Sequence, residues 1–158
     1  MKVLVAIDGS ACSEAAVAGV AARPWPAGSE FIVLSAYELP LMPTPETWAI
    51  SPDYCDRLSD AVREHAQTVT DSARAKLTEA FGDSFAVTSE IMAGSPRSAI
   101  LERAEAWEAD LIVVGSHGYR AWERFLLGSV SQAIVSHAKC SVEVVRCKSA
   151  QIQQPEAA

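Results

Sequence analysis

Short apolar runs rich in β-branched residues alternate with longer helix-like segments along most of this chain, and this alternation constrains its fold most. Residues 110–114, with the sequence DLIVV, form one such run. Runs of this kind are typical of strands that are buried on both faces of a sheet. Strands that alternate with helices pair in parallel, and the helices cover both faces through right-handed crossovers. The sequence therefore predicts an α/β fold with a doubly wound, five-stranded parallel sheet.

Cap and turn residues set the predicted bounds of the elements. Ser10 is placed to cap the first helix, and Pro96 suits the first turn of a later one. Four prolines between residues 39 and 52 exclude a regular element there and predict a stiff loop. The predicted strands are residues 2–8, 30–37, 85–92, 110–114 and 141–146, and the predicted helices run from Ser10 to about Ala22 and over 53–81, 96–107 and 131–137.

Length and charge limit the classes of function. A chain of 158 residues is large enough for one domain with its own core, which we place at residues 1–147, followed by a polar, disordered tail at 148–158. The formal net charge of −7 argues against a protein that holds nucleic acid or an anionic membrane by bulk electrostatics. The apolar stretch after Met1 is too short for a signal peptide or a membrane span. We therefore expect neither a nucleic acid nor a membrane as partner.

The cysteines predict a cytoplasmic protein with reduced thiols. Four are present, at positions 12, 55, 140 and 147, with no Cys-x-x-Cys pair and no histidine at zinc-finger spacing. A small, partly buried apolar role is the ordinary one for each. Cys12 differs because it lies near the start of the first predicted helix, where the helix dipole favours a thiolate.

Two glycine-containing segments predict a site for an anion. Gly115-Ser116-His117-Gly118 directly follows the run at 110–114, and Gly128-Ser129 lies just ahead of the helix-like segment 131–137. Glycine at 115 and 118 allows the backbone to approach a ligand and permits the positive φ with which consecutive N–H groups form an anion nest. At the second segment, unpaired N–H groups and the helix dipole favour a phosphate.

Asp8 ends the first predicted strand and is the candidate partner of this glycine loop. Ligands of open α/β sheets bind beyond the carboxyl ends of the strands, where the strand order reverses. If the first and fourth strands are neighbours at that point, Asp8 faces the loop and can accept hydrogen bonds from a ribose. The alternative, that Asp8 only caps the first helix, stays open. His117 is interpreted as a loop residue near phosphate and not as a catalytic base, because no acid or nucleophile is evident beside it.

These residues resemble the universal stress protein family. The resemblance rests on a first strand ending in Asp8-Gly9-Ser10 and on the motif Gly-x2-Gly-x9-Gly-Ser, matched at Gly115, Gly118, Gly128 and Ser129, and it extends over residues 2–146. It implies one α/β domain with strand order 3-2-1-4-5, a homodimer and, in the branch that carries the motif, ATP bound at the reversal of strand order.

The resemblance also implies a role for individual residues. Asp8 would contact the ribose, the backbone at Ala36 the adenine, and the motif residues with Val130 the phosphates, while His117 and Arg120 lie in the loop that covers them. ATP is the expected cofactor, with Mg²⁺ as an optional companion, and neither a protein-held metal nor a catalytic residue is predicted. The expected nucleotide-binding residues are Asp8, Gly9, Ser10, Ala36, Gly94, Val114, Gly115, Ser116, His117, Gly118, Arg120, Gly128, Ser129 and Val130.

Two classes of function fit this site. The first is an ATP-binding regulatory or stress-response protein whose nucleotide occupancy tunes an interaction with a protein partner of unknown identity. The alternative is a slow nucleotide hydrolase or transferase, at most a weak ATPase, because the sequence has no Gly-x4-Gly-Lys-Ser/Thr loop and no evident carboxylate pair for Mg²⁺. An RNA-binding module built on the Gly-x-x-Gly loop is disfavoured by the acidic charge and the parallel α/β pattern.

The fifth predicted strand, residues 141–146, predicts how two copies assemble. In the order 3-2-1-4-5 it lies at an edge of the sheet, and an open apolar edge invites pairing with another copy. Val142 and Val144 share one face of this strand, and Glu143 points to the other, where members of the family often carry an apolar residue. We expect an antiparallel homodimer held by backbone hydrogen bonds and the two valines.

Overall fold

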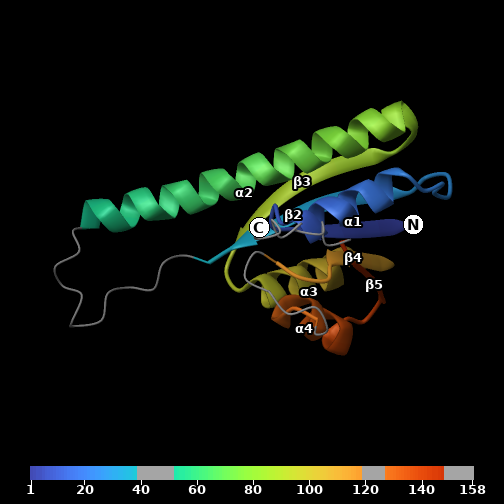
Figure 1. The fold of residues 1–158 in the computed structure, drawn as a ribbon. Coiled ribbons are helices and arrows are strands. Elements are labelled where there is room, and N and C mark those ends of the chain that lie inside the picture. The colour runs from blue at the N-terminus through green and yellow to red at the C-terminus, as the bar shows by residue number, and fades with distance from the viewer. Residues whose placement is uncertain (39–51, 119–126, 148–158) are drawn as a thin grey trace, which may run out of the picture.

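The computed structural model describes residues 1–38, 52–118 and 127–147, and strands alternate with helices throughout (Figure 1). All strand pairings are parallel, in the order β3-β2-β1-β4-β5, so the predicted fold class and strand order are confirmed. The elements are β1 (Lys2–Ile7), α1 (Ala11–Ala21), β2 (Glu30–Tyr37), α2 (Pro52–Phe81), the short 3-10 helix η2 (Gly82–Ser84), β3 (Ala86–Ala93), α3 (Pro96–Trp107), β4 (Leu111–Gly115), α4 (Ser129–His137) and β5 (Ser141–Val145).

The predicted bounds agree with these elements to within two residues. Ser10 caps α1 as expected, because its side chain accepts a hydrogen bond from the Ser13 N–H at 3.3 Å. Helix α4 begins at Ser129, two residues earlier than predicted, since Gly128 is its N-cap. The predicted loop at 39–52 lies outside the described residues except for Pro52, which begins α2, and the predicted tail at 148–158 lies outside them altogether.

Apolar side chains fill both faces of the sheet. Helices α1 and α2 cover one face, where Val17 and Leu77 belong to the same buried cluster as Val5. Helices α3 and α4 cover the other, where Ile100 and Ile134 belong to the same buried cluster as Leu4. Figure 1 shows the two pairs of helices on opposite sides of the strands. The central strands read as continuous apolar runs because both of their faces are buried.

Among the side chains of α2 that the structure describes, those of the C-terminal half pack on the sheet. The N-terminal part of the helix does not reach the core, and Leu58 is 39% exposed. The buried positions are Ala66, Thr70, Ala73, Leu77 and Phe81. Despite its length α2 is too polar to cross a bilayer, and no other helix of the described segments has the length and hydrophobicity that this requires.

Glu143 is paired with Arg23 on the α1 side of β5. The guanidinium donates two hydrogen bonds to the carboxylate, one of them from Nη1 to Oε2 at 2.6 Å, and this hydrogen-bonded carboxylate raises the pKa of Arg23. Val142 and Val144 point to the opposite face and pack against the core cluster that contains Ile134. The predicted alternation of Val142 and Val144 on one face with Glu143 on the other is therefore present. Glu143, where members of the family often carry an apolar residue, is paired with Arg23.

A second ion pair fixes helix α3 against the edge strand β3. Arg103 donates from Nε and Nη2 to the two carboxylate oxygens of Glu90, at 2.6 and 2.8 Å. The hydrogen-bonded guanidinium lowers the pKa of the Glu90 carboxyl. This pair contributes to the position of α3 on the sheet. The N-terminus of α3 lies at the edge of the sheet where the parallel strands end.

Candidate functional site

The carboxyl ends of β1 and β4 lie side by side at the centre of the sheet. The two strands are in register from Val3 with Leu111 to Ala6 with Val114, so they end at the same edge. From β1 the chain crosses to β2 on one side, whereas β4 pairs on the other, which makes this the point where the strand order reverses. Asp8 follows β1 directly, and Gly115 is the last residue of β4.

A cavity of about 560 Å³ opens at this edge. Sites for small molecules have volumes of about 300–1,000 Å³, so the space is sufficient for one. Half of the lining residues that the structure describes were predicted, namely Asp8, Ala36, Val114, Gly115, His117, Gly118, Gly128, Ser129 and Val130. The other half was not predicted and consists of Ala6, Ile7, Ser13, Glu38, Ser95, Pro96, Arg97, Ile100 and Ser131.

The remaining predicted residues lie beside the cavity or outside the described chain. Gly9, Ser10, Gly94 and Ser116 are not part of the lining. Arg120 lies outside the described residues. Gly9 and Gly94 have φ of 81° and 128°, values that favour glycine and let the chain turn directly after β1 and β3.

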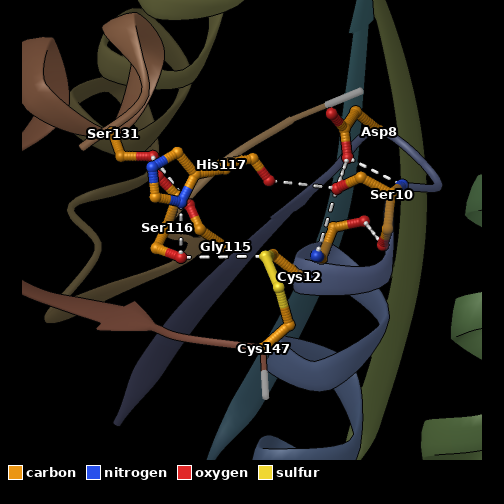
Figure 2. Close-up of a disulfide and its surroundings, with 9 residues drawn as sticks. Asp8, Ser10, Cys12, Gly115, Ser116, His117, Ser131 and Cys147 are labelled. Atoms are coloured by element: carbon orange, nitrogen blue, oxygen red, sulfur yellow. Dashed lines mark hydrogen bonds between the residues drawn. A yellow bond between two sulfur atoms is a disulfide. The ribbon is translucent and has the colours of Figure 1, made fainter. Parts of the chain in front are cut away.

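Asp8 contacts the residue that caps α1 and also faces the glycine loop, while its contact with a ribose stays a prediction. Its Oδ1 accepts hydrogen bonds from the Ser10 N–H at 3.0 Å and from the Ser10 hydroxyl at 2.6 Å, and thereby orients the residue that caps α1. Its Oδ2 faces the glycine loop, 2.6 Å from the place where a Cβ on Gly118 would lie. Figure 2 shows the carboxylate above Ser10, with the His117 carbonyl within 3.3 Å of the same hydroxyl. One oxygen of Asp8 thus belongs to the cap and the other to the cavity.

Gly115 and Gly118 are required by space and not by backbone torsion. A Cβ on Gly115 would lie 2.7 Å from the backbone carbonyl carbon of Cys12, and Asp8 leaves as little room at Gly118. Neither residue is among the glycines of the described chain that have positive φ. The expectation of positive φ at these two positions is therefore wrong. At Gly115 the loop lies so close to the backbone of α1 that no side chain fits, and at Gly118 a Cβ would require the Asp8 carboxylate to move.

Hydrogen bonds join the two halves of the glycine motif. The Gly128 N–H donates to the Ser116 carbonyl at 2.8 Å, and the Ser131 hydroxyl donates to the Gly115 carbonyl at 2.6 Å. A Cβ on Gly128 would lie 3.3 Å from the Ser116 oxygen, so a larger residue would press on this junction. Ser131 was not predicted, and its place in the first turn of α4, three residues after Gly128, is the signal that could have identified it.

Two helix N-termini border the cavity without a side-chain cap. Gly128 is the N-cap of α4 and Ser95 that of α3, and neither caps through its side chain. The N–H groups of a first helical turn and the helix dipole together favour an anion. Arg97, exposed in the first turn of α3, adds a positive charge. Sequence reasoning missed it because no motif connected this helix to the glycine loop.

Carboxylates also contribute to the lining, through Asp8 and Glu38. Over residues 1–38, 52–118 and 127–147, however, no group of three or more His, Cys, Asp or Glu side chains is arranged to hold a metal ion. In its described part the cavity therefore offers backbone N–H groups, hydroxyls and one guanidinium to an anion, together with two carboxylates that can accept hydrogen bonds from a ligand.

A disulfide lies directly behind the glycine loop. Cys12 in the first turn of α1 is bonded to Cys147, which follows β5, across 135 residues of sequence (Figure 2). The prediction of reduced thiols is wrong for this pair. It could not be read from the spacing of the cysteines, because the order β1-β4-β5 is what brings the end of β5 beside α1. Cys55 and Cys140 are free thiols, and burial raises the pKa of Cys140.

An open, doubly wound sheet with a cavity at its reversal of strand order defines a class of α/β domains that bind their ligands at this edge. Within that class, residues 1–146 match the model of the Universal stress protein family. The chain belongs to the universal stress protein family.

Individual relatives agree with this assignment. Universal stress protein MJ0531 of Methanocaldococcus jannaschii is 36% identical over 89 residues, which cover 56% of this chain and 51% of that protein, so the chain spans about half the length of this curated relative. The structure of hypothetical protein MJ0577 is 27% identical, with a TM-score of 0.78 over 94% of this chain and 96% of that one. A universal stress protein family protein from Arabidopsis thaliana with AMP bound, 18% identical, shares the fold, with a TM-score of 0.68 over 94% and 93% of the two chains.

Replacement of Gly115 by alanine tests the packing of the loop against α1. We expect Gly115→Ala to lower the free energy of unfolding by about 1–3 kcal/mol, because the new methyl group overpacks a closed contact. Gly19→Ala is the matched control, since its methyl group would meet only the end of Arg23 at 3.7 Å within a helix, and it should be neutral or raise stability by up to ~1 kcal/mol. Urea unfolding followed by circular dichroism measures both. Equal stability of the two variants would contradict the close contact.

Proposed function

We propose that this chain binds an adenine nucleotide, with ATP as the preferred form, in the cavity beside β1 and β4. The observation that carries the proposal is that Asp8 faces the glycine loop so closely that a Cβ on Gly118 would lie against its Oδ2. Both line a cavity that is bordered by the N-termini of two helices without side-chain caps. A site with these donors suits a ligand with both hydroxyls and phosphates. The AMP-bound relative from Arabidopsis thaliana, which shares the fold, supports the choice of an adenine nucleotide.

The phosphates would lie against the glycine motif and the start of α4. There the backbone N–H groups of Ser129 and Val130 belong to the first turn of a helix that has no side-chain cap, so they are available in the geometry that phosphates prefer. Arg97 would add a charge-assisted contact from α3. Arg120 and His117 are proposed for the loop that covers the phosphates, as the family resemblance implies.

The nucleoside would lie along the ends of β1 and β2. We assign the ribose hydroxyls to Asp8 Oδ2, because Oδ1 already accepts two hydrogen bonds from Ser10. The adenine would meet the backbone at Ala36 and the apolar part of the lining, which includes Ile7 and Ile100. Gly9, Ser10, Gly94, Val114 and Ser116 complete the proposed site as the residues that fix its backbone.

Binding without fast turnover is the activity we propose. The ring nitrogen Nδ1 of His117 lies 3.1 Å from the Ser116 hydroxyl, so this nitrogen is engaged within the loop. A general base needs direct reach to the proton that it removes. Mg²⁺ would then accompany ATP through the phosphates and water, as it commonly does in nucleotide sites. The alternative of a slow hydrolase or transferase differs from this proposal in rate and in its dependence on His117.

We further propose a regulatory use of the bound nucleotide in the cytoplasm. A ligand changes a protein interaction only if it binds two states of the protein with different affinity. The loop from Gly115 to Gly118 is the element that contacts both the cavity and the end of β5, because the Ser116 N–H donates to the Val145 carbonyl at 2.8 Å. Nucleotide at the loop could thus alter a surface formed by β5 and be sensed there by a protein partner.

The edge of β5 is also where we propose that two copies pair. Val142 and Val144 pack against the core of their own chain, and Glu143 pairs with Arg23, so these side chains have intramolecular partners. Backbone hydrogen bonds along the outer edge of β5 would therefore supply the main contact of an antiparallel homodimer. The two valines contribute less than the sequence suggested.

Nucleotide binding is tested by Gly118→Ala, which adds only the Cβ that would lie 2.6 Å from Asp8 Oδ2. We expect a loss of at least about 10-fold in ATP affinity by titration calorimetry, a difference of about 1.4 kcal/mol, because Asp8 and the loop must separate. Circular dichroism should stay native, and Gly19→Ala should bind as the wild type does. Unchanged ATP affinity in a folded Gly118→Ala protein would sink the assignment of this loop.

Turnover separates binding from catalysis. With saturating ATP and Mg²⁺ we expect a rate far below the ~10 s⁻¹ that is typical of enzymes, and His117→Ala should change the affinity for ATP more than the rate. Release of inorganic phosphate over many turnovers measures the rate. Hydrolysis at enzyme-like speed that His117→Ala abolishes would establish the alternative, an ATPase.

Assembly is tested on the wild-type chain. We expect light scattering to give twice the 16.9 kDa of one chain, with slow hydrogen exchange at those β5 amides that do not bond to β4. On dilution into the monomer range these amides should exchange faster, while amides of β1 stay protected. A monomer at all concentrations, or protection of β5 that does not depend on concentration, would contradict pairing through this edge.

A further inference from the structure

We propose that Cys12 and Cys147 form a reversible thiol–disulfide couple that reacts with low-molecular-weight thiols and disulfides, and that its state controls the glycine loop. The effect on ligand affinity rests on the proposed nucleotide function. The reaction itself and the response of the loop do not rest on it.

The position of the pair is the first observation. Cys12 is buried, with 5% exposure, whereas Cys147 is partly exposed, two residues after the end of β5. Ser116 contacts both of the segments that the disulfide joins. Its N–H donates to the Val145 carbonyl at 2.8 Å, near the end of β5, and its hydroxyl lies 3.7 Å from Cys12 Sγ in α1. The disulfide therefore holds α1 and the end of β5 on either side of the first residue of the loop beyond β4.

The two sulfur atoms are differently suited to exchange. An external thiolate can attack Sγ of Cys147, the more exposed of the two residues, and form a mixed disulfide while Cys12 leaves as a thiolate. The first turn of α1 and the Ser116 hydroxyl both favour negative charge on Cys12. A second external thiolate then displaces Cys147. Two external thiols are oxidised to one disulfide, the protein bond is reduced by two electrons, and the two protons pass to the cysteine thiolates.

Hydrogen bonds through Ser116 make the protonation of the His117 ring depend on whether Cys12 is a disulfide or a thiol. A disulfide sulfur can only accept, so the Ser116 hydroxyl donates toward Cys12 and its oxygen is left to accept from His117 Nδ1, 3.1 Å away. A reduced Cys12 has an S–H that can donate to Ser116, and the Ser116 hydroxyl can then turn and donate to Nδ1. In Figure 2, dashed lines link Cys12 to the Ser116 hydroxyl and the same hydroxyl to His117. The disulfide thus favours the His117 tautomer with hydrogen on Nδ1, and reduction shifts the ring toward the other tautomer.

The couple also changes the freedom of the loop. With the disulfide closed, the Val145 carbonyl and Cys12 are held together, and the loop bonded to them is preorganised. After reduction the covalent link between α1 and the end of β5 is lost, so more of the order of the loop must be supplied when a ligand binds, which weakens binding. Coupling between two sites is reciprocal, so a nucleotide that prefers the closed form must protect the disulfide by the same factor.

The experiment uses the full chain with Cys55→Ser and Cys140→Ser, which leaves one pair of cysteines. The protein is equilibrated over a series of ratios of reduced to oxidised glutathione, and the fraction of disulfide is read by alkylation and mass spectrometry. The ¹⁵N shifts of the His117 ring are recorded in both states without nucleotide. ATP affinity is measured in both states by calorimetry. The matched control carries Cys12→Ser and Cys147→Ser in addition.

We expect a disulfide that opens reversibly, ring shifts that move from the Nδ1–H form toward the other tautomer on reduction, and ATP affinity about 5-fold weaker in the reduced state. Saturating ATP should shift the glutathione midpoint, expressed as the square of the reduced glutathione concentration divided by the oxidised glutathione concentration, by the same factor. The control should respond to none of these changes. Failure of the pair to oxidise at any ratio overturns the couple. Oxidation without a change at His117 overturns its control of the loop.

Two further outcomes concern the nucleotide. Equal ATP affinity in the two states, with a disulfide that forms, overturns the coupling to the site. Absence of ATP binding in either state instead contradicts the proposed function, while mass spectrometry and the His117 shifts still decide between a couple that controls the loop and one that does not.

Discussion

The parallel pairing of β1 with β4 is the constraint on which the rest of the structure depends. Because the two strands are in register as far as Ala6 and Val114, Asp8 and the loop after Gly115 leave the sheet side by side. Burial of both faces of these strands supplies the driving force, since each face packs against its own pair of helices. A different neighbour for β1 would leave the carboxylate and the glycine motif on separate parts of the molecule.

Lack of space, more than backbone freedom, explains the glycine motif. Gly115 lies against the backbone of α1, and Gly118 lies against Asp8, so each side of the loop touches a part of the chain that a Cβ would displace. The same closeness lets Asp8 serve two elements, with Oδ1 on the helix cap and Oδ2 toward the loop. The start of α1 and the glycine loop therefore pack against each other and together form one wall of the cavity.

Local donors allow an acidic protein to accept an anion. The chain carries a formal net charge of −7, yet two helix N-termini without side-chain caps open onto the cavity, and Arg97 lies beside one of them. Backbone dipoles act over a few ångströms, where they outweigh screened charges farther away on the surface. One of these helices, α3, is held against the sheet by its buried core residues Ile100 and Ala104 and by the ion pair between Arg103 and Glu90.

The sequence by itself determined the fold class, the order of elements and the loop–helix segment of the motif, because periodicity, caps and turns are local properties. It also identified half of the cavity lining, from Asp8 to Val130. Only the tertiary structure decided the rest. Arg97 and Ser131 joined the cavity through packing of α3 and α4, the glycines proved necessary for closeness and not for φ, and Cys12 met Cys147 across 135 residues. The family resemblance supplied the strand order, but each of these features depends on how side chains and backbones from distant segments pack around it, and no local pattern encodes such long-range contacts.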